Sequence, residues 1–258
     1  MSEPKIIFPE DLVKEETMAT RNFFSQELKR LREDILAMAA KAEENLAKAL
    51  TALRTCDAEL VKEVRSDDAE VDELQKRIED DALIIIATQQ PVARDLREMV
   101  TIFKLTSSIE RIGDYAVHLA KAAKKLTKAG ISPFRAQEHL EKMAETGQIM
   151  LRMAISAYLE QNADKAREAA GMDIVINTEH KIITNDILKL MKKKSSLVKS
   201  AFQILQSSNQ LERLGDHITN ICEAVIYMIE GKHEPQPGSS KKSEGSSLEP
   251  QLGTSKMG

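Results

Sequence analysis

The chain has 258 residues and carries 41 acidic against 37 basic side chains, which gives a formal net charge of −4 and an isoelectric point near 5.9. This balance excludes a nucleic-acid binder that works by neutralising phosphates, because such a protein needs a strongly basic surface. No apolar run is long enough to span a bilayer, and the N-terminus lacks a basic segment followed by an apolar one. We therefore expect a cytoplasmic protein.

The first half of the chain predicts three long amphipathic helices. Apolar residues recur at steps of three and four over about 24–53, 60–85 and 102–126. This spacing gathers them on one face of a helix with about 3.6 residues per turn. The pattern is interrupted near Cys56, at Gln90-Pro91 and near Gly130, which are the expected turns.

The second half predicts three more helices, at about 134–161, 163–193 and 196–230, with turns at 162–164 and 194–196. We therefore expect an all-α protein of two tandem three-helix bundles, with six long helices that form an internal pseudo-repeat. The predicted divisions are an N-terminal extension (1–16), the first bundle (17–130), the second bundle (131–230) and a disordered tail (231–258). The tail is rich in glycine, proline, serine and lysine, and such a composition buries too little apolar surface to order itself.

One short motif occurs in both halves. The pentapeptide at 110–114, Glu-Arg-Ile-Gly-Asp, returns at 212–216 as Glu-Arg-Leu-Gly-Asp, 102 positions later (212 − 110). Each copy places two carboxylates at i and i+4, one above the other on a helix face. A glycine inside a helix costs about 1 kcal/mol relative to alanine, so we expect a neighbour to approach closely at Gly113 and Gly215.

A second acidic pair precedes each pentapeptide. Asp68 and Asp72 lie on the second predicted helix, and Asp173 and Asn177 lie on the fifth. Position 91, the expected turn, is midway between positions 70 and 112, which are the centres of the first two pairs. In an antiparallel hairpin the two pairs should therefore lie at the same level, on helices whose axes are about 8–10 Å apart. In the second half, the point midway between the centres of the other two pairs falls between residues 194 and 195, which is again an expected turn.

Carboxylates that converge at a surface repel one another, and this raises their pKa values unless a cation neutralises them. Oxygen ligands suit magnesium, calcium, manganese or ferric iron, with zinc less favoured, and bridging carboxylates suit more than one ion. His118, four residues after Asp114, could extend such a ligand set. The alternative is a surface network of salt bridges around Arg111 and Arg213 without any metal.

These motifs resemble the PhoU family. The resemblance covers about residues 20–231 and depends on the two pentapeptides, the Asp68 to Asp72 run and the Gln90-Pro91 turn followed by Asp95-Leu96-Arg97. It implies two three-helix bundles whose surfaces hold multinuclear metal clusters, of iron, manganese, magnesium or zinc, through Glu/Asp-x-x-x-Asp motifs. Carried to this chain, the implied metal ligands are Asp68, Asp72, Glu110, Asp114, Asp173, Asn177, Glu212 and Asp216.

The resemblance also implies a cytoplasmic negative regulator of phosphate uptake and of the phosphate-starvation response, and not an enzyme. Its implied partners are the ATPase subunit of the phosphate ABC transporter and the phosphate-sensing histidine kinase. It implies a homodimer that reaches the membrane only through those partners. One departure matters: Asn177 stands where the motif has a second carboxylate, so we expect the second cluster to be weaker.

Two other functions remain open at this stage. A metal-free helical scaffold would use the acidic faces only as solvated surface. A carboxylate-bridged metalloenzyme would use the metals to activate water or oxygen. The sequence offers no glycine-rich phosphate loop and no nucleophile elbow, which disfavours the enzyme.

Overall fold

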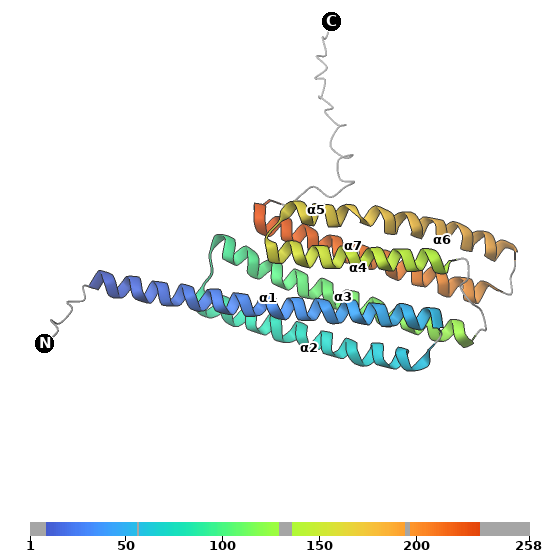
Figure 1. The fold of residues 1–258 in the computed structure, drawn as a ribbon, viewed down its shortest axis with the longest axis horizontal. Coiled ribbons are helices and arrows are strands. Elements are labelled where there is room, and N and C mark those ends of the chain that lie inside the picture. The colour runs from blue at the N-terminus through green and yellow to red at the C-terminus, as the bar shows by residue number, and fades with distance from the viewer. Residues whose placement is uncertain (1–8, 56, 129–135, 194–196, 233–258) are drawn as a thin grey trace, which may run out of the picture.

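Helices form nearly all of the part of the chain that the computed structural model describes, which is residues 9–55, 57–128, 136–193 and 197–232. No strand occurs in those ranges, so the predicted all-α fold is confirmed (Figure 1). The predicted disordered tail lies outside the described residues apart from Gly231 and Lys232. The helices are α1 (Pro9–Thr55), α2 (Ala58–Gln89), α3 (Ala93–Lys128), α4 (Gln137–Glu160), α5 (Ala163–Gly171), α6 (Asp173–Lys193) and α7 (Val198–Glu230).

The turn between α2 and α3 falls where the sequence predicts it. Gln90 takes a left-handed conformation with φ of 46° and donates its N–H to the carbonyl of Ile86, which closes the C-terminus of α2. Pro91 has no N–H to continue the helix. At the other end of α2, the Asp57 side chain accepts hydrogen bonds from the first backbone N–H groups of the helix. Both ends of α2 are thus fixed by local chemistry.

The predicted helix at 163–193 needs one correction, because the structure divides it into α5 and α6 at Met172. The Met172 N–H bonds to the carbonyl of Ala169, three residues back, which tightens the last turn of α5. Gly171, with low helix propensity, immediately precedes the break. The two segments follow one another along the same side of the molecule in Figure 1, so the helix is interrupted without reversing direction.

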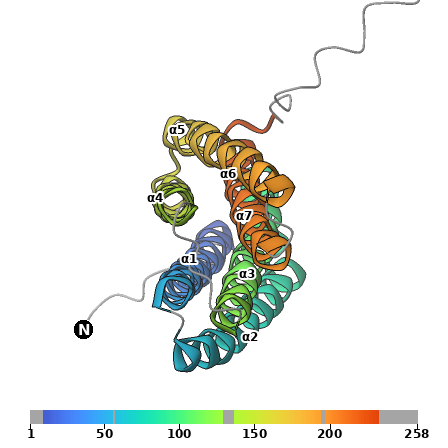
Figure 2. The same cartoon turned by 90° about the vertical axis from the view of Figure 1, so that its right-hand side faces the viewer.

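Two three-helix bundles lie side by side. Helices α1, α2 and α3 pack together, as do α4, α5–α6 and α7, and α3 packs along α7 between the two groups (Figure 2). The Thr101 hydroxyl donates to the Ala224 carbonyl at 3.3 Å, and the Arg97 Nε donates to the Met228 carbonyl at 3.3 Å. Because rising numbers on α3 meet falling numbers on α7, the two helices are antiparallel. The predicted pair of bundles is confirmed.

Apolar side chains along each bundle axis are removed from water, with Ile35, Ile109 and Leu214 among those fully buried. Burial of a side chain of this size contributes roughly 1.5–3 kcal/mol, so these interiors supply most of the folding free energy. One buried polar cluster ties the bundles together. The Arg32 guanidinium donates two hydrogen bonds to Glu98, at 2.8 and 2.9 Å, and the Tyr158 hydroxyl reaches the same carboxylate at 3.3 Å.

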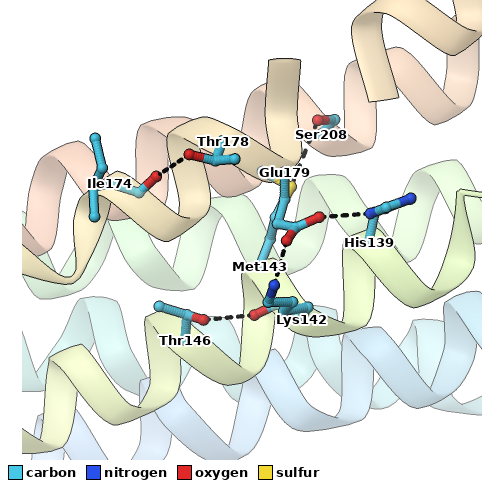
Figure 3. Close-up of polar contacts among 8 residues, drawn as sticks. All are labelled: His139, Lys142, Met143, Thr146, Ile174, Thr178, Glu179 and Ser208. Carbon is cyan, nitrogen blue, oxygen red and sulfur yellow. Dashed lines mark hydrogen bonds and ion pairs between the residues drawn. The ribbon is translucent and has the colours of Figure 1, made fainter. Parts of the chain in front are cut away.

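A second polar cluster fixes the rotation of α6. The Glu179 side chain is 6% exposed, and it accepts hydrogen bonds from Lys142 and pairs with the His139 ring nitrogen on α4 (Figure 3). The Lys142 ammonium, and then the His139 ring, hold the pKa of Glu179 below its usual range. Because a buried charge needs such partners, α6 has one favoured orientation. This orientation turns Asp173 toward α7.

Candidate metal centre

Two acidic sites lie on the outside of the bundles. The first acidic site comprises Asp68 and Asp72 on α2 with Glu110 and Asp114 on α3, and the second comprises Asp173 and Asn177 on α6 with Glu212 and Asp216 on α7. Seven of these eight side chains are half-buried and Asp216 is exposed. None lies in the hydrophobic core, so the predicted surface location is confirmed.

The two motif glycines bring an aspartate of the neighbouring helix against the backbone. A Cβ atom added to Gly113 would lie 2.7 Å from Oδ1 of Asp68. A Cβ added to Gly215 would lie even nearer to Oδ1 of Asp173, and 3.1 Å from Cδ1 of Ile176. Any larger residue at either position would displace the aspartate carboxylate from this place. The expected close approach is confirmed, and the approaching group is a member of the site itself.

These contacts also fix the register of the helices. Asp68 lies opposite Gly113 across α2 and α3, and Asp173 lies opposite Gly215 across α6 and α7. Both pairings agree within one residue with the levels predicted from the two turns. The acidic pairs are therefore neighbours in each half.

Mutual repulsion is visible in the first acidic site. Burial, followed by the charges of Asp72, Asp114 and Glu110, raises the pKa of Asp68 to about 6. Burial and Asp114 also raise the pKa of Glu110. Arg111 partly offsets this repulsion, since it donates to Oδ2 of Asp114 at 2.9 Å and lies 3.4 Å from Oε2 of Glu110. The salt-bridge arrangement considered above thus occurs at Arg111, whereas Arg213 forms no ion pair with the described residues.

The second acidic site has a different hydrogen-bond pattern. The Asn177 amide donates to Oδ2 of Asp173. Burial, Asp216 and Glu212 raise the pKa of Asp173, while the Asn177 hydrogen bond lowers it. The other oxygen, Oδ1, is buried and has no hydrogen-bond partner among the described residues. A buried acceptor without a partner typically costs about 1–3 kcal/mol, so this oxygen lacks a donor or a cation.

The donor chemistry of both sites suits a hard cation, because every candidate atom is an oxygen and the carboxylates repel one another. The side chains are not already arranged as a metal site. Among the described residues, no three His, Cys, Asp or Glu side chains are grouped so that they could hold a metal ion. Coordination would require side-chain rotation, including the release of Asp114 by Arg111. The ligand assignments therefore stay a prediction.

An aromatic pair lies between the two sites. Tyr115 on α3 and His217 on α7 are equivalent positions of the repeat (217 − 115 = 102), and their ring centroids are 5.6 Å apart. The contacts of Arg97 and Thr101 with α7, and that of His118 with Gln210, place positions 112 and 214 at about the same level. The two acidic sites therefore flank one seam between the bundles.

His118 is directed toward this seam. Its Nδ1 lies 3.3 Å from Oε1 of Gln210 on α7, and its ring is 6.5 Å from that of Tyr115. Sequence reasoning considered His118 and missed Tyr115 and His217. The available signal was the same repeat spacing, continued one residue beyond the pentapeptide.

No described helix combines the length and the apolar character needed to cross a bilayer.

Comparison with known proteins identifies one domain family. The sequence model of the PhoU domain matches residues 35–123 and 140–225, which contain both acidic sites. A phosphate-specific transport system accessory protein PhoU homolog of Clostridium acetobutylicum is 36% identical over 214 residues, which is 83% of this chain and 97% of that protein. A protein with the same description from Pseudomonas putida is 32% identical over 81% of each chain.

Two solved structures are similar over the same region. The crystal structure of PhoU from Pseudomonas aeruginosa superposes with a TM-score of 0.78 at 32% identity, covering 81% of this chain and all of that one. The phosphate transport system regulatory protein PhoU from Streptococcus pneumoniae gives a TM-score of 0.76 at 29% identity, covering 82% of this chain and 99% of that one. Both similarities cover the two bundles together.

Proposed function

This chain belongs to the PhoU family, and on that premise we propose that it is a metal-binding regulatory adaptor of phosphate homeostasis. Its relatives are named as accessory proteins of phosphate-specific transport, which supports a regulatory role in phosphate transport. The adaptor lowers phosphate uptake and represses phosphate-starvation signalling. It does so by contacting the ATPase subunit of the phosphate ABC transporter and the phosphate-sensing histidine kinase. It acts in the cytoplasm as a homodimer and reaches the membrane only through these partners.

The duplicated aspartate-over-glycine contact carries this proposal. In each half an aspartate is held against the next helix at the single position where a glycine leaves space, although burial and neighbouring carboxylates oppose its ionisation. A fold that needed only stability would gain by neutralising such a group. Retention of the charge in both halves supports a role in binding cations.

The metal proposal names ligands but no coordination geometry. Asp68, Asp72, Glu110 and Asp114 would hold the first cluster, and Asp173, Asn177, Glu212 and Asp216 the second. Bound cations would neutralise the repulsion and link α2 to α3 and α6 to α7. The protein's own groups set the occupancy, since Arg111 competes with a cation for Asp114.

The test combines metal analysis with a cellular readout. The wild type, the double variant Asp68→Asn/Asp114→Asn and the control Glu59→Gln are each expressed in a strain that lacks the protein and carries a phosphate-starvation reporter. Glu59 is a highly exposed carboxylate of α2, outside both sites. We expect metal in the purified wild type and control, and loss of the first-site metal with derepressed signalling in the double variant.

A metal-free scaffold is the second candidate, because Arg111 already neutralises part of the first acidic site. Full repression by a double variant that has lost the first-site metal, or a purified wild type that contains no metal, would favour the scaffold and contradict the metal proposal. Absence of any effect on phosphate uptake or signalling when the protein is deleted would contradict the regulatory role itself.

A further inference from the structure

Two arginines border the seam between α3 and α7. Arg111 and Arg213 are equivalent positions of the repeat (213 − 111 = 102), and both side chains are exposed. Arg111 precedes Tyr115 by about one helical turn and Arg213 precedes His217 by the same interval, so each arginine lies on the helix face that carries the seam aromatic. Since positions 112 and 214 are at about the same level, the two arginines lie at nearly one height on opposite sides of the seam.

The charges of both arginines reach the aromatic residues of the seam. Tyr115 is buried, and burial raises the pKa of its hydroxyl, whereas Arg213 and then Arg111 lower it. Burial, and then the charge of Arg111 on the opposite helix, lower the pKa of His217. Each arginine therefore acts on the aromatic residue of the other helix. The four side chains are grouped at one level, where one bundle meets the other.

The same group contains a polar atom without a partner. Nδ1 of His217 is buried and forms no hydrogen bond with any described residue. A buried polar atom of this kind is stabilised by any group that enters the seam and bonds to it. The Tyr115 hydroxyl, on the ring that contacts His217, can donate a hydrogen bond. The seam thus offers two guanidinium groups and two aromatic polar groups to a ligand.

Without metal, the seam repels an anion. The two pentapeptides place four carboxylates and two arginines around it, which is a net charge of −2 (2 − 4). Arg111 is also engaged within its own helix, since it donates to Asp114 at 2.9 Å and lies 3.4 Å from Glu110. In this state one of the two guanidinium groups is already paired.

Metal binding would reverse this balance, so the inference rests on the proposed metal-binding function. Cations that balance the carboxylates of the two acidic sites leave the arginines as the unbalanced charge, and coordination of Asp114 releases the Arg111 guanidinium. Other charges along the seam do not restore an acidic excess. Lys121 is ten residues beyond Arg111, and Lys104 and Glu223, about two to three turns away toward the other end, offset each other.

We propose that the metal-loaded protein binds inorganic phosphate at this seam, between Arg111 and Arg213. A guanidinium group can donate two parallel N–H bonds to the oxygens of a phosphate. Two such groups on facing helices suit a tetrahedral dianion, which has oxygens to offer on both sides. Phosphate is the candidate because the proposed function concerns phosphate homeostasis. Since α3 belongs to one bundle and α7 to the other, the bound anion would link the two bundles, and only while metal is present.

The test measures binding of radiolabelled inorganic phosphate to the full chain by equilibrium dialysis, after free metal has been removed. The seam variant is Arg111→Gln/Arg213→Gln. The control, Arg30→Gln/Arg54→Gln, removes two exposed arginines of α1, which packs against α2, α3 and α4 and not along the seam. Exposed substitutions of this kind rarely disturb folding, which circular dichroism would verify. Metal content is measured in each sample, and a wild-type sample stripped with a chelator is included.

We expect the metal-loaded wild type and the control to bind phosphate within twofold of each other. The seam variant should retain its metal and bind phosphate at least tenfold more weakly, as should the stripped wild type. Equal binding by the seam variant would assign the phosphate to the metal ions themselves and would overturn the inference. Equal binding by the stripped protein would overturn the dependence on metal.

The remaining outcomes separate this inference from the proposed function. A wild type that contains metal but binds no phosphate would overturn the inference alone, because the starvation reporter tests the regulatory role independently. A wild type that retains no metal would overturn the metal proposal and the inference together.

Discussion

The two acidic sites have the same backbone arrangement but differ in the number of charged side chains. In both, an aspartate lies over a glycine of the neighbouring helix, at the same level relative to the pentapeptide. The first site then adds three carboxylates and the bridging Arg111, whereas the second adds two carboxylates and the Asn177 amide. Burial raises the pKa of the central aspartate in each half, and only in the second does an amide hydrogen bond oppose this shift.

This difference separates the geometry of the site from its charge. The duplicated hairpins keep the helices, the glycine and the aspartate in place, so the geometry does not depend on Asn177. The number of anionic groups then sets how strongly each half attracts a cation. The molecule therefore contains its own comparison between a four-carboxylate and a three-carboxylate version of one site.

The largest expected effect is on metal retention. Asp68→Asn should remove more metal from freshly purified protein than Asp173→Asn, because the first site has the greater negative charge and should hold more of the bound ions. We expect at least tenfold weaker binding at the first site, and a smaller loss from the second-site change. Element-resolved metal analysis measures both. Equal occupancy of the two sites, lost equally to a chelator, would show that Asn177 does not weaken the second site.

Restoring the missing carboxylate sharpens the comparison. Asn177→Asp should raise metal retention in the second site about tenfold, toward that of the first, because it supplies another anionic oxygen ligand. Thr178→Asp is the matched control, since it adds the same charge at an exposed position on a different side of α6. Competition with a chelator of known affinity gives the change for each variant. A similar gain in both would mean that net charge, and not position, determines retention.

The motif glycines should differ in their effect on stability. Gly113→Ala gains about 1 kcal/mol of helix propensity and displaces mainly the Asp68 carboxylate, so its free energy of unfolding should stay near that of the wild type. Gly215→Ala makes the same gain but also crowds Ile176, which is fully buried. Overpacking typically costs about 1–3 kcal/mol, so we expect a net loss on the order of 1 kcal/mol. Denaturant unfolding in chelator would measure both, and equal stability would contradict the tighter packing at Gly215.

The sequence alone predicts the long helices, the turn at Pro91 and the level of the acidic pairs, because helical periodicity and hairpin register follow local rules. The break at Met172 could not, since Gly171 alone does not end a helix and the tightened turn depends on tertiary packing. The packing of α3 along α7 could not be predicted from the sequence either. Periodicity shows that a face is buried but does not identify its partner.

The same limit explains what was missed within the site. Arg111 belongs to the recognised pentapeptide, yet its pairing with Asp114 depends on a side-chain conformation that spacing does not determine. Tyr115 and His217 follow the two pentapeptides directly, and their contact depends on the seam between the bundles. Extending the repeat by one residue would have identified them as equivalent positions, though not as neighbours.

The smallest expected effect is a pH dependence that tests whether the first site is repulsive without metal. The pKa of Asp68 is raised to about 6 from an ordinary value of 3.8, so the folded state binds this proton more tightly than the unfolded state does. Ionised Asp68 therefore destabilises the protein above about pH 6, and this penalty disappears as the pH falls toward 4. Asp68→Asn removes the charge at every pH.

In chelator, Asp68→Asn should accordingly be more stable than the wild type at pH 7.5, by about 1 kcal/mol or less because solvent screens a half-exposed carboxylate. Most of the advantage should be lost by pH 4, where the wild-type group is protonated in the folded state and partly protonated in the unfolded state. Glu63→Gln, at an exposed position of the same helix, controls for the loss of one acidic group. Unfolding in urea at the two pH values gives the difference. If Asp68→Asn showed no advantage at pH 7.5, water alone would solvate the carboxylates adequately. The first site would then have no greater electrostatic need for a cation than the second site has.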